Sequence, residues 1–288
     1  MLPDFVILGA PRCGTTSLAR VLGEHPEAYV PGVKEIGFFQ AQKHWSRGLE
    51  WYESFFEKAP ETARICGEAT PYYLQSEKAA ERIADVLPEA RLITIVRDPV
   101  ERARSHFFLR RRLGDETRSF REAVEEAVRS QDDPDYFLNQ GLYSRGLKHY
   151  TERFGSNQLE VVVFERLVAD QQEELANLQS FLGLTPVDLE LPKANESRRP
   201  RSEWFQRAWK RLISFSGPVK ALVRKMTTRS LRKRIYRGIR ELNLKSADKP
   251  PMQASTRRLL RDYFADETDR VRKILDDDLS EWQSDTSQ

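Results

Sequence analysis

The feature that most constrains this chain is a short apolar run that leads directly into a glycine-containing loop and then a helix. Residues Phe5–Leu8 are continuously apolar and β-branched in part, which is typical of a strand buried on both faces. The loop reads GAPRCGTTS over residues 9–17, and the helical pattern after it places Leu18, Val21 and Leu22 on one face. A strand, a loop and a helix in this order predict an α/β fold.

Two later apolar runs extend the prediction to a sheet. Arg91–Val96 and Leu159–Phe164 are uninterrupted runs without polar alternation, and a helical pattern follows the second at Glu173–Leu182. Buried strands that alternate with helices indicate a parallel sheet covered on both faces. We therefore expect a three-layer domain with a central parallel sheet flanked by helices.

The loop between the first strand and helix resembles a phosphate-binding loop. Gly9 and Gly14 have the spacing of G-x-x-x-x-G-K-[ST], and Thr16 supplies the hydroxyl. Backbone N–H groups and the positive helix end at such a loop favour an anion. Thr15 stands where nucleotide-hydrolysing loops have lysine, and the cation is Arg12 instead, which disfavours ATP or GTP as substrate. The structural alternative is a tight turn that happens to contain two glycines.

A second anion-binding element follows the strand Arg91–Val96. Arg97 ends this strand, and Ser105 lies two turns into the helix that comes next. Asp98, Pro99 and Glu101 have the pattern of an N-cap, first helical proline and capping box. Because ligands gather at the carboxyl ends of parallel strands, Arg97 and Ser105 are candidates for an anion clamp. A structural Arg97–Asp98 ion pair is the alternative.

Two further residues share the helix face of Ser105. Arg102, Ser105 and His106 have i, i+3, i+4 spacing, and we expect solvated or capping roles for Arg102 and His106, with a role beside the ligand as the alternative.

Together the two elements resemble a known family. GAPRCGTTS and LITIVRDPVERARSHF are similar to the two cofactor signatures of sulfotransferases that use 3′-phosphoadenylyl sulfate (PAPS). The resemblance implies a P-loop-like fold and a reaction that transfers a sulfuryl group and leaves adenosine 3′,5′-bisphosphate, with no metal required. It also implies that the 5′-phosphosulfate is held by Arg12, Cys13, Gly14, Thr15, Thr16 and Ser17, and the 3′-phosphate by Arg97 and Ser105.

Further segments resemble glycan sulfotransferases of the heparan-sulfate type. KEIGFF at 34–39 matches their K-E-x-x-F-F segment, and GEATPYY at 67–73 and the region 143–184 are also similar. The resemblance implies that Glu35 is the catalytic base, whereas the residues alone would suggest a surface Lys-Glu pair. Two positions depart from the pattern: Arg12 replaces a lysine, so it should act electrostatically and not as a proton donor, and Ala69 replaces a lysine credited with acceptor contact.

Aromatic residues follow the Glu35 segment. Trp45, Trp51 and Tyr52 could form a wall for a sugar or lipid acceptor, or could belong to the core. The acceptor implied is a hydroxyl or amine of a carbohydrate, a glycolipid or a small molecule.

The charge of the chain is unevenly distributed. The 44 residues 197–240 hold 15 Lys and Arg against one acid, whereas the other 244 residues hold 32 Lys and Arg against 43 Asp and Glu. This segment could attract an anionic acceptor, contact a membrane surface or pack on the core, and without a recognition motif we expect no nucleic-acid partner. Arg198 and Arg199 fall where family members place a basic loop that closes over PAPS.

The domain boundaries and the compartment follow from the remaining composition. We expect a PAPS-binding core at 1–195 and a basic helical portion of the same domain at 196–288, which ends in an amphipathic helix at 256–279. Two cysteines and four scattered histidines predict neither a disulfide framework nor a metal centre. The N-terminus does not resemble a signal peptide, which favours a cytoplasmic protein, with peripheral membrane contact through the basic helices as an alternative.

Two other functions compete on the residues alone. One is a small-molecule kinase with an altered phosphate loop, for which Asp98 is the best Mg²⁺ ligand. The other is a non-catalytic basic protein that binds membranes or nucleic acid.

Overall fold

The structure, a computed structural model, describes most of the chain outside the basic segment. The described residues are 1–33, 35–130, 136–155, 157–192, 198–200, 244–246 and 250–283. Lys34 and residues 201–243 lie outside them, so the prediction of basic helices there is not addressed.

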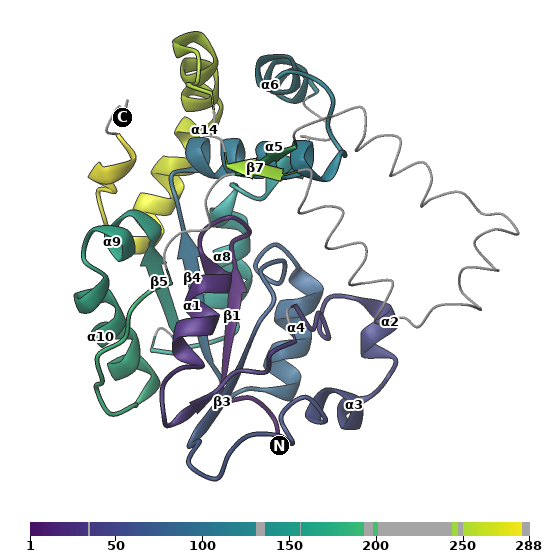
Figure 1. The fold of residues 1–288 in the computed structure, drawn as a ribbon, viewed down its shortest axis with the longest axis vertical. Coiled ribbons are helices and arrows are strands. Elements are labelled where there is room, and N and C mark those ends of the chain that lie inside the picture. Colours follow the sequence, from purple (N-terminus) through teal and green to yellow (C-terminus); the bar gives the residue numbers. More distant parts are fainter. Residues whose placement is uncertain are drawn as a thin grey trace, which may run out of the picture.

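A five-stranded parallel sheet forms the centre of the described chain (Figure 1). The strands lie in the order β2-β3-β1-β4-β5, and all neighbouring pairs are parallel. They are β1 Phe5–Gly9, β2 Ala28–Tyr29, β3 Ile65–Ala69, β4 Arg91–Val96 and β5 Leu159–Val163. The strand order runs in opposite directions on the two sides of β1, so the crevice at the carboxyl ends of β1 and β4 is the topological switch point where such sheets bind ligands.

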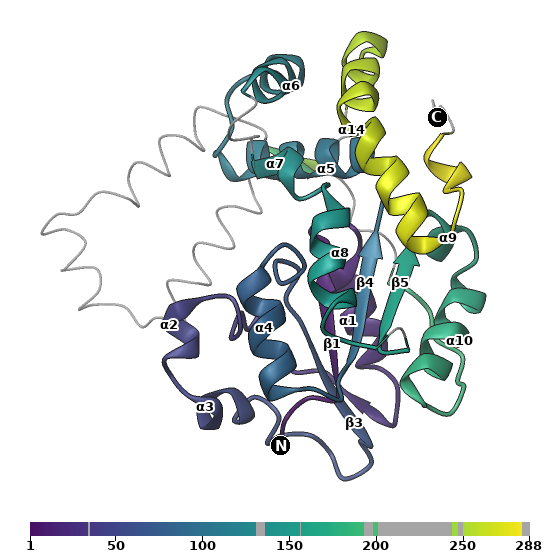
Figure 2. The same ribbon diagram turned by 180° about the vertical axis from the view of Figure 1, so that it is seen from behind.

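Helices cover both faces of the sheet, which gives three layers. Figure 1 shows α1 in front of β1, and the reverse view in Figure 2 shows α4 and α8 in front of the strands, with α9 and α10 beside β5 in both. The helices are α1 Thr15–Leu22, α2 Gln42–Trp45, α3 Leu49–Glu53, α4 Glu77–Val86, α5 Pro99–Leu113, α6 Phe120–Arg129, α7 Tyr136–Asn139, α8 Tyr143–Thr151, α9 Phe164–Ala169, α10 Gln171–Leu182 and α14 Ala254–Leu275, with a 3₁₀ turn η1 at Ser280–Trp282.

Two hydrophobic cores stabilise this arrangement. The larger one surrounds the sheet and includes Leu18, Val21 and Leu22 of α1, which are fully buried as their spacing predicted. Burying such side chains contributes ~1.5–3 kcal/mol each. The smaller core joins α5, α6, α7 and α14 beyond the carboxyl end of the sheet, and includes Phe107 and Phe264. This second core holds α5 over the crevice where ligands would bind.

The P-loop-like α/β fold predicted from the sequence is confirmed. The predicted strands at 5–8, 91–96 and 159–164 coincide with β1, β4 and β5 within one residue, and the closing helix is α14. The sequence reading missed β2 and β3. A short antiparallel pair, β6 Arg198–Pro200 with β7 Leu244–Ser246, was not expected either, and β6 lies against α5.

Candidate active site

The phosphate loop joins β1 to α1 at the switch point. Gly14, just before α1, has φ +93°, a left-handed conformation that glycine adopts without strain, and a Cβ there would lie 3.2 Å from the Phe164 ring. A Cβ on Gly9 would lie 2.8 Å from the Pro71 carbonyl oxygen. No side chain caps the N-terminus of α1, and the first N–H groups of a helix have no partner inside it. Both glycines are therefore required by the loop geometry, and the helix end can bind an anion.

The loop and the predicted clamp meet in direct hydrogen bonds. Arg12 Nε donates to Ser105 Oγ at 3.2 Å, and Arg97 Nη1 donates to the Arg12 carbonyl oxygen at 3.5 Å. Partial desolvation and the neighbouring cations Arg112 and Arg97 lower the pKa of Arg12. A guanidinium remains charged at physiological pH, so the three cations concentrate positive charge where a polyanion would bind.

Cys13 faces the core from the loop. Its Sγ lies 3.7 Å from the Tyr143 hydroxyl, which donates to the Arg97 carbonyl oxygen at 2.9 Å. Burial raises the pKa of Cys13 to about 11, so the side chain is a neutral thiol. Because the side chain is buried, contact between Cys13 and a bound phosphate would be confined to its backbone. Tyr143 links loop and clamp, a role that the sequence did not suggest.

Arg97 is oriented by residues from the β5–α9 junction. Its guanidinium carbon lies 4.5 Å above the Phe164 ring, and its Nε lies 3.9 Å from Glu165 Oε1. Glu165 in turn accepts from the Asp98 backbone N–H at 3.2 Å and from Trp282 Nε1 at 3.1 Å. Burial raises the pKa of Glu165. Neither Glu165 nor Trp282 carries a local sequence signal, because their partners are 67 and 117 residues away.

Asp98 is the N-cap of α5, as predicted, but the predicted capping box is wrong. Its Oδ1 accepts from the Val100 N–H at 2.9 Å, and Pro99 occupies the first turn. Glu101, which the box would use, instead pairs with Arg257 at 3.0 Å, and Glu165 takes the Asp98 N–H. Among the described residues Asp98 pairs with Arg261, which donates to both carboxylate oxygens at 3.1 and 2.9 Å, so the alternative of an Arg97–Asp98 ion pair is not found.

Arg102 and His106 are buried, so the prediction that they are solvated or cap the helix is wrong. Arg102 is fully buried and His106 is 3% exposed. Arg102 donates to the Phe137 carbonyl oxygen and to His106 Nδ1, the latter at 3.3 Å. Burial and the neighbouring cations Arg102, Arg12 and Arg110 lower the pKa of His106 to about 3. His106 is therefore neutral, and Arg102 adds a buried positive charge behind the clamp.

Glu35 lies on an exposed turn beside the segment that follows β3. Its φ is +57° and that of Gly37 is +64°, so the turn uses two left-handed residues. The Gly37 N–H donates to Thr70 Oγ1 at 3.1 Å, and Thr70 itself donates through its backbone N–H to the Ile7 carbonyl oxygen at 3.1 Å. The segment after β3 therefore separates the Glu35 turn from the strand that leads into the phosphate loop.

The aromatic residues after this turn divide between core and surface. Tyr52 is fully buried, which excludes it from an acceptor wall. Trp45 and Trp51 are partly exposed, and each lies against a guanidinium, with Arg82 at 4.4 Å and Arg47 at 4.2 Å from the ring centroids.

The remaining predicted residues are Arg198 and Arg199 in β6 and the two threonines of the phosphate loop. Only the backbone of Arg198 and Arg199 is described, in β6 beside α5, so their predicted contact with cofactor phosphates stays a prediction. Thr16 is exposed at the loop, whereas Thr15 is buried. Within the described residues, no cluster of three His, Cys, Asp or Glu side chains could hold a metal ion, and no helix is long and apolar enough to cross a membrane.

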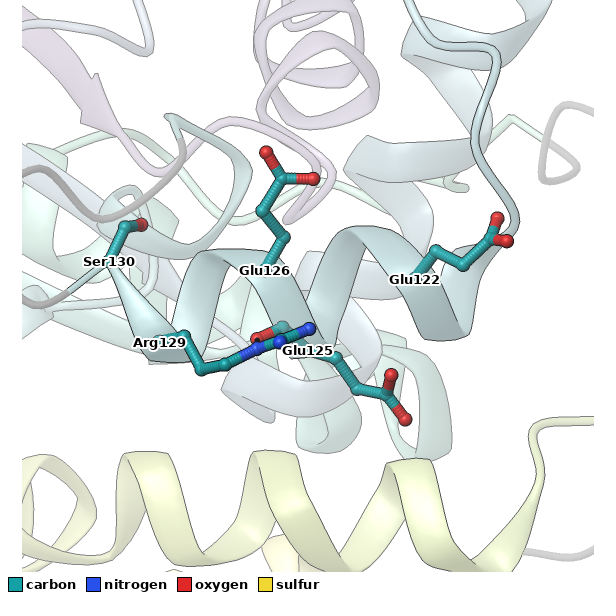
Figure 3. Close-up of a pocket in the computed structure, with 5 residues that line it drawn as sticks. All are labelled: Glu122, Glu125, Glu126, Arg129 and Ser130. Carbon is teal, nitrogen blue, oxygen red and sulfur yellow. Dashed lines mark hydrogen bonds between the residues drawn. The ribbon is translucent and has the colours of Figure 1, made fainter.

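A separate shallow pocket lies on α6 (Figure 3). It is lined by Glu122, Glu125, Glu126, Arg129 and Ser130. The Arg129 side chain is turned back along the helix, where its Nε donates to the Glu125 carbonyl oxygen at 2.9 Å. With three carboxylates in its wall, this pocket is unsuited to a phosphate-bearing ligand, and it shares no residue with the phosphate loop.

Comparisons with known proteins agree with the geometry of the site. A family model described as a sulfotransferase domain matches residues 2–205. Heparan sulfate glucosamine 3-O-sulfotransferase 3A1 of Mus musculus is 34% identical over 189 residues, which cover 65% of this chain and 47% of that protein. Membrane-associated sulfotransferase kil1 of Dictyostelium discoideum is 38% identical over 108 residues, covering 37% of this chain and 22% of that protein.

A solved structure shares both the fold and nearly the whole length of the chain. The sulfotransferase from Alicyclobacillus acidocaldarius is 25% identical, with a TM-score of 0.68, and the match covers 99% of this chain and 100% of that one. This chain spans less than half the length of the two curated relatives named above. Because the family model matches well over half of the sequence, the chain belongs to the family of PAPS-dependent sulfotransferases.

Proposed function

We propose that this protein transfers a sulfuryl group from PAPS to a hydroxyl or amine of a carbohydrate, glycolipid or small-molecule acceptor. The observation that carries the proposal is the junction of loop and clamp, where Arg12 Nε lies 3.2 Å from Ser105 Oγ and Arg97 contacts the Arg12 carbonyl oxygen. This junction brings a helix N-terminus, two guanidinium groups and a hydroxyl to one point at the carboxyl ends of β1 and β4. A nucleotide with phosphates on both the 3′ and the 5′ oxygen of one ribose is the class of anion that this arrangement fits.

The residues present fit the cofactor. Gly14 has no Cβ to press against the Phe164 ring, so the loop can pass close to that ring. The N–H groups at the start of α1 can bind the oxygens of a 5′-phosphosulfate. Arg97, held by Phe164 and Glu165, and Ser105 of α5 would bind the 3′-phosphate. When bound, PAPS supplies an electrophilic sulfuryl group whose bridging oxygen departs with the 5′-phosphate.

Each residue has a defined part in the transfer. Glu35 accepts the proton of the acceptor hydroxyl or amine as the acceptor atom bonds to sulfur. With the donor bound, Arg12 would stabilise negative charge on the departing bridging oxygen, and it would act as a fixed charge because arginine does not give up its proton. The loop N–H groups and the clamp hold the donor in line with the acceptor.

A carbohydrate is the acceptor class that the relatives favour. The mouse relative is by its name a heparan sulfate glucosamine 3-O-sulfotransferase. Ala69, at the end of β3, stands where the resemblance implies a lysine that contacts the acceptor. The acceptor of this chain therefore need not be heparan sulfate itself. The kinase alternative gains no support, because Asp98 is engaged by Arg261 and the Val100 N–H.

Two measurements test this function. In a thermal-shift assay, adenosine 3′,5′-bisphosphate should stabilise the protein and ATP with Mg²⁺ should not. With ³⁵S-labelled PAPS, label should pass to at least one member of a panel of desulfated heparan sulfate, galactosylceramide and 4-nitrophenol. Stabilisation by ATP with Mg²⁺ but not by the bisphosphate would favour a kinase and contradict the proposal.

A further inference from the structure

A buried carboxylate next to the Glu35 turn has no part in the chemistry proposed above. Glu68 of β3 is 1% exposed, and its side-chain hydrogen-bond donors among the described residues are neutral hydroxyls. Its Oε1 accepts from the Tyr52 hydroxyl at 2.8 Å and the Tyr73 hydroxyl at 3.0 Å, and its Oε2 accepts from the Thr70 hydroxyl at 2.8 Å. A buried carboxylate is costly, and three hydroxyl donors are what stabilise it here.

Two of the three hydroxyls that donate to Glu68 also accept hydrogen bonds from the backbone of the Glu35 turn. Because each hydroxyl donates its hydrogen to Glu68, its oxygen lone pairs are left to accept from other groups. Thr70 Oγ1 accepts from the Gly37 N–H at 3.1 Å, and the Tyr73 hydroxyl oxygen accepts from the Phe39 N–H at 3.3 Å. These amides lie two and four residues after Glu35.

The turn depends on such external contacts. A left-handed conformation is unfavourable for a non-glycine residue such as Glu35, with φ +57°, so the surroundings must hold it. The same segment is fixed to β1, since the Thr70 N–H bonds to the Ile7 carbonyl oxygen at 3.1 Å and the Leu74 N–H to the Leu8 carbonyl oxygen at 2.9 Å. Glu68 therefore connects the Glu35 turn to the strand that enters the phosphate loop.

We propose that Glu68 is a positioning residue that fixes the Glu35 turn relative to the phosphate loop, acting through the hydroxyls of Thr70 and Tyr73. The inference rests on the proposed role of Glu35 as base. Glu68 does not touch the reacting atoms; it fixes the direction of the two hydroxyls that bind the turn.

The chain offers a matched set of hydroxyl deletions to test this. Tyr73→Phe and Tyr52→Phe each remove one hydroxyl from Glu68 Oε1 in the same buried cluster, but only Tyr73 also binds the turn. Thr70→Val removes the other hydroxyl that does so. Glu68→Gln, which keeps the shape of the side chain, tests the carboxylate directly; the three hydroxyl variants keep the test decisive if this variant does not fold.

The first readout does not need an acceptor. Hydrogen–deuterium exchange, measured by mass spectrometry on peptides that cover residues 35–41, should rise about tenfold or more in Glu68→Gln, Thr70→Val and Tyr73→Phe and change little in Tyr52→Phe. Equal exchange in the two tyrosine variants would overturn the proposal, because the network would then be a general stabilising cluster. If the wild type transfers no sulfuryl group, the proposed function fails, while this readout still decides whether Glu68 holds the turn.

The second readout is catalytic. With an acceptor from the panel above, kcat should fall about tenfold or more in Thr70→Val and Tyr73→Phe, and less in Tyr52→Phe, while the affinity for adenosine 3′,5′-bisphosphate stays unchanged. A loss of bisphosphate affinity that parallels the loss of kcat would contradict a role confined to the Glu35 turn.

Discussion

Arg12 is the residue at which the two predicted anion-binding elements of this protein meet. Its side chain bonds Ser105 of α5, its carbonyl oxygen accepts from Arg97 after β4, and its φ of +76° is left-handed. Arg112 and Arg97 lower the pKa of Arg12 through like-charge repulsion that adds to desolvation. An anion placed among these cations would relieve the repulsion, which agrees with the prediction that the loop binds an anionic ligand.

Among single residues, the sequence predicted those of the loop and clamp but not the residues that hydrogen-bond to them and hold them in place. The glycines, Arg12, Arg97 and Ser105 lie in local patterns that can be read along the chain. Tyr143, Glu165 and Trp282 come from distant segments, and nothing in their neighbours marks them. Glu68 stood inside a recognised segment, yet its role depends on three hydroxyls that only the folded chain brings together.

The role of Glu35 can be tested by removing its charge. Glu35→Gln should lower kcat by about 10²-fold or more, because the amide cannot accept the acceptor proton, and should leave bisphosphate affinity unchanged. Radiolabel transfer and isothermal titration calorimetry measure the two quantities. Glu24→Gln, which changes an exposed glutamate after α1, is the control. Full activity in Glu35→Gln would remove Glu35 as the base.

Among the elements, those with a strong apolar pattern were predicted and the others were missed. β1 and β4 are continuous apolar runs, and their predicted bounds agree with the structure. β3 has the sequence ICGEA, which includes glycine and a buried glutamate and has little strand propensity of its own. It is a strand because it pairs with β1 and because the Phe5 ring occupies the space beside Gly67. Such pairing is a property of the assembled sheet and not of the segment.

Helix α5 contains a histidine that should couple stability to pH. The folded-state pKa of His106, about 3, is far below the usual 6.5 because burial and neighbouring cations disfavour the charged form. Below pH 6.5 the unfolded chain binds a proton that the folded chain does not, so stability falls as pH falls toward 3. Between pH 7.5 and pH 5 this residue alone should lower the free energy of unfolding by ~2 kcal/mol.

Urea unfolding at the two pH values measures this effect. His106→Asn keeps an acceptor for Arg102 at the position of Nδ1 and removes the titration, so its stability should fall by ~2 kcal/mol less than that of the wild type over the same interval. An equal fall in both proteins would show that His106 does not titrate as its burial implies.

Over the whole molecule, the C-terminal helix α14 ties the second core to the clamp. Its Arg261 binds Asp98 with two hydrogen bonds across 163 positions of sequence, and its Glu267 accepts from the Ser144 N–H at 2.6 Å. After α14, Asp277 and Glu281 bind Arg166 of α9. The sequence predicted an amphipathic closing helix, but its apolar face could not specify these partners.

Removing Arg261 should destabilise the protein through Asp98. Asp98 is 5% exposed, and without its arginine the carboxylate would remain buried with the Val100 N–H as its one hydrogen-bond donor among the described residues. Arg261→Met should therefore lower the free energy of unfolding by about 3 kcal/mol, measured by urea unfolding at pH 7.5. Arg258→Met, one turn earlier and exposed, is the control. A change no larger than that of the control would contradict the role of this pair.

Charge at the same scale separates the chain into two parts. The segment 197–240 has a net charge of +14, whereas the remaining residues have a net charge of −11. We expect an acidic body to bind a polyanionic cofactor through placed groups, here the helix N-terminus, Arg12, Arg97 and Ser105, and not through its overall charge.

The most direct test is whether the 3′-phosphate is recognised by the clamp. Isothermal titration calorimetry compares adenosine 3′,5′-bisphosphate with adenosine 5′-monophosphate, which lacks that group. The wild type should bind the bisphosphate at least about tenfold more tightly than the monophosphate, and so should the control Arg91→Ala, which is changed at the exposed opposite end of β4. Arg97→Ala should bind the two nucleotides with nearly equal affinity. Equal affinity of the wild type for both nucleotides would contradict the account.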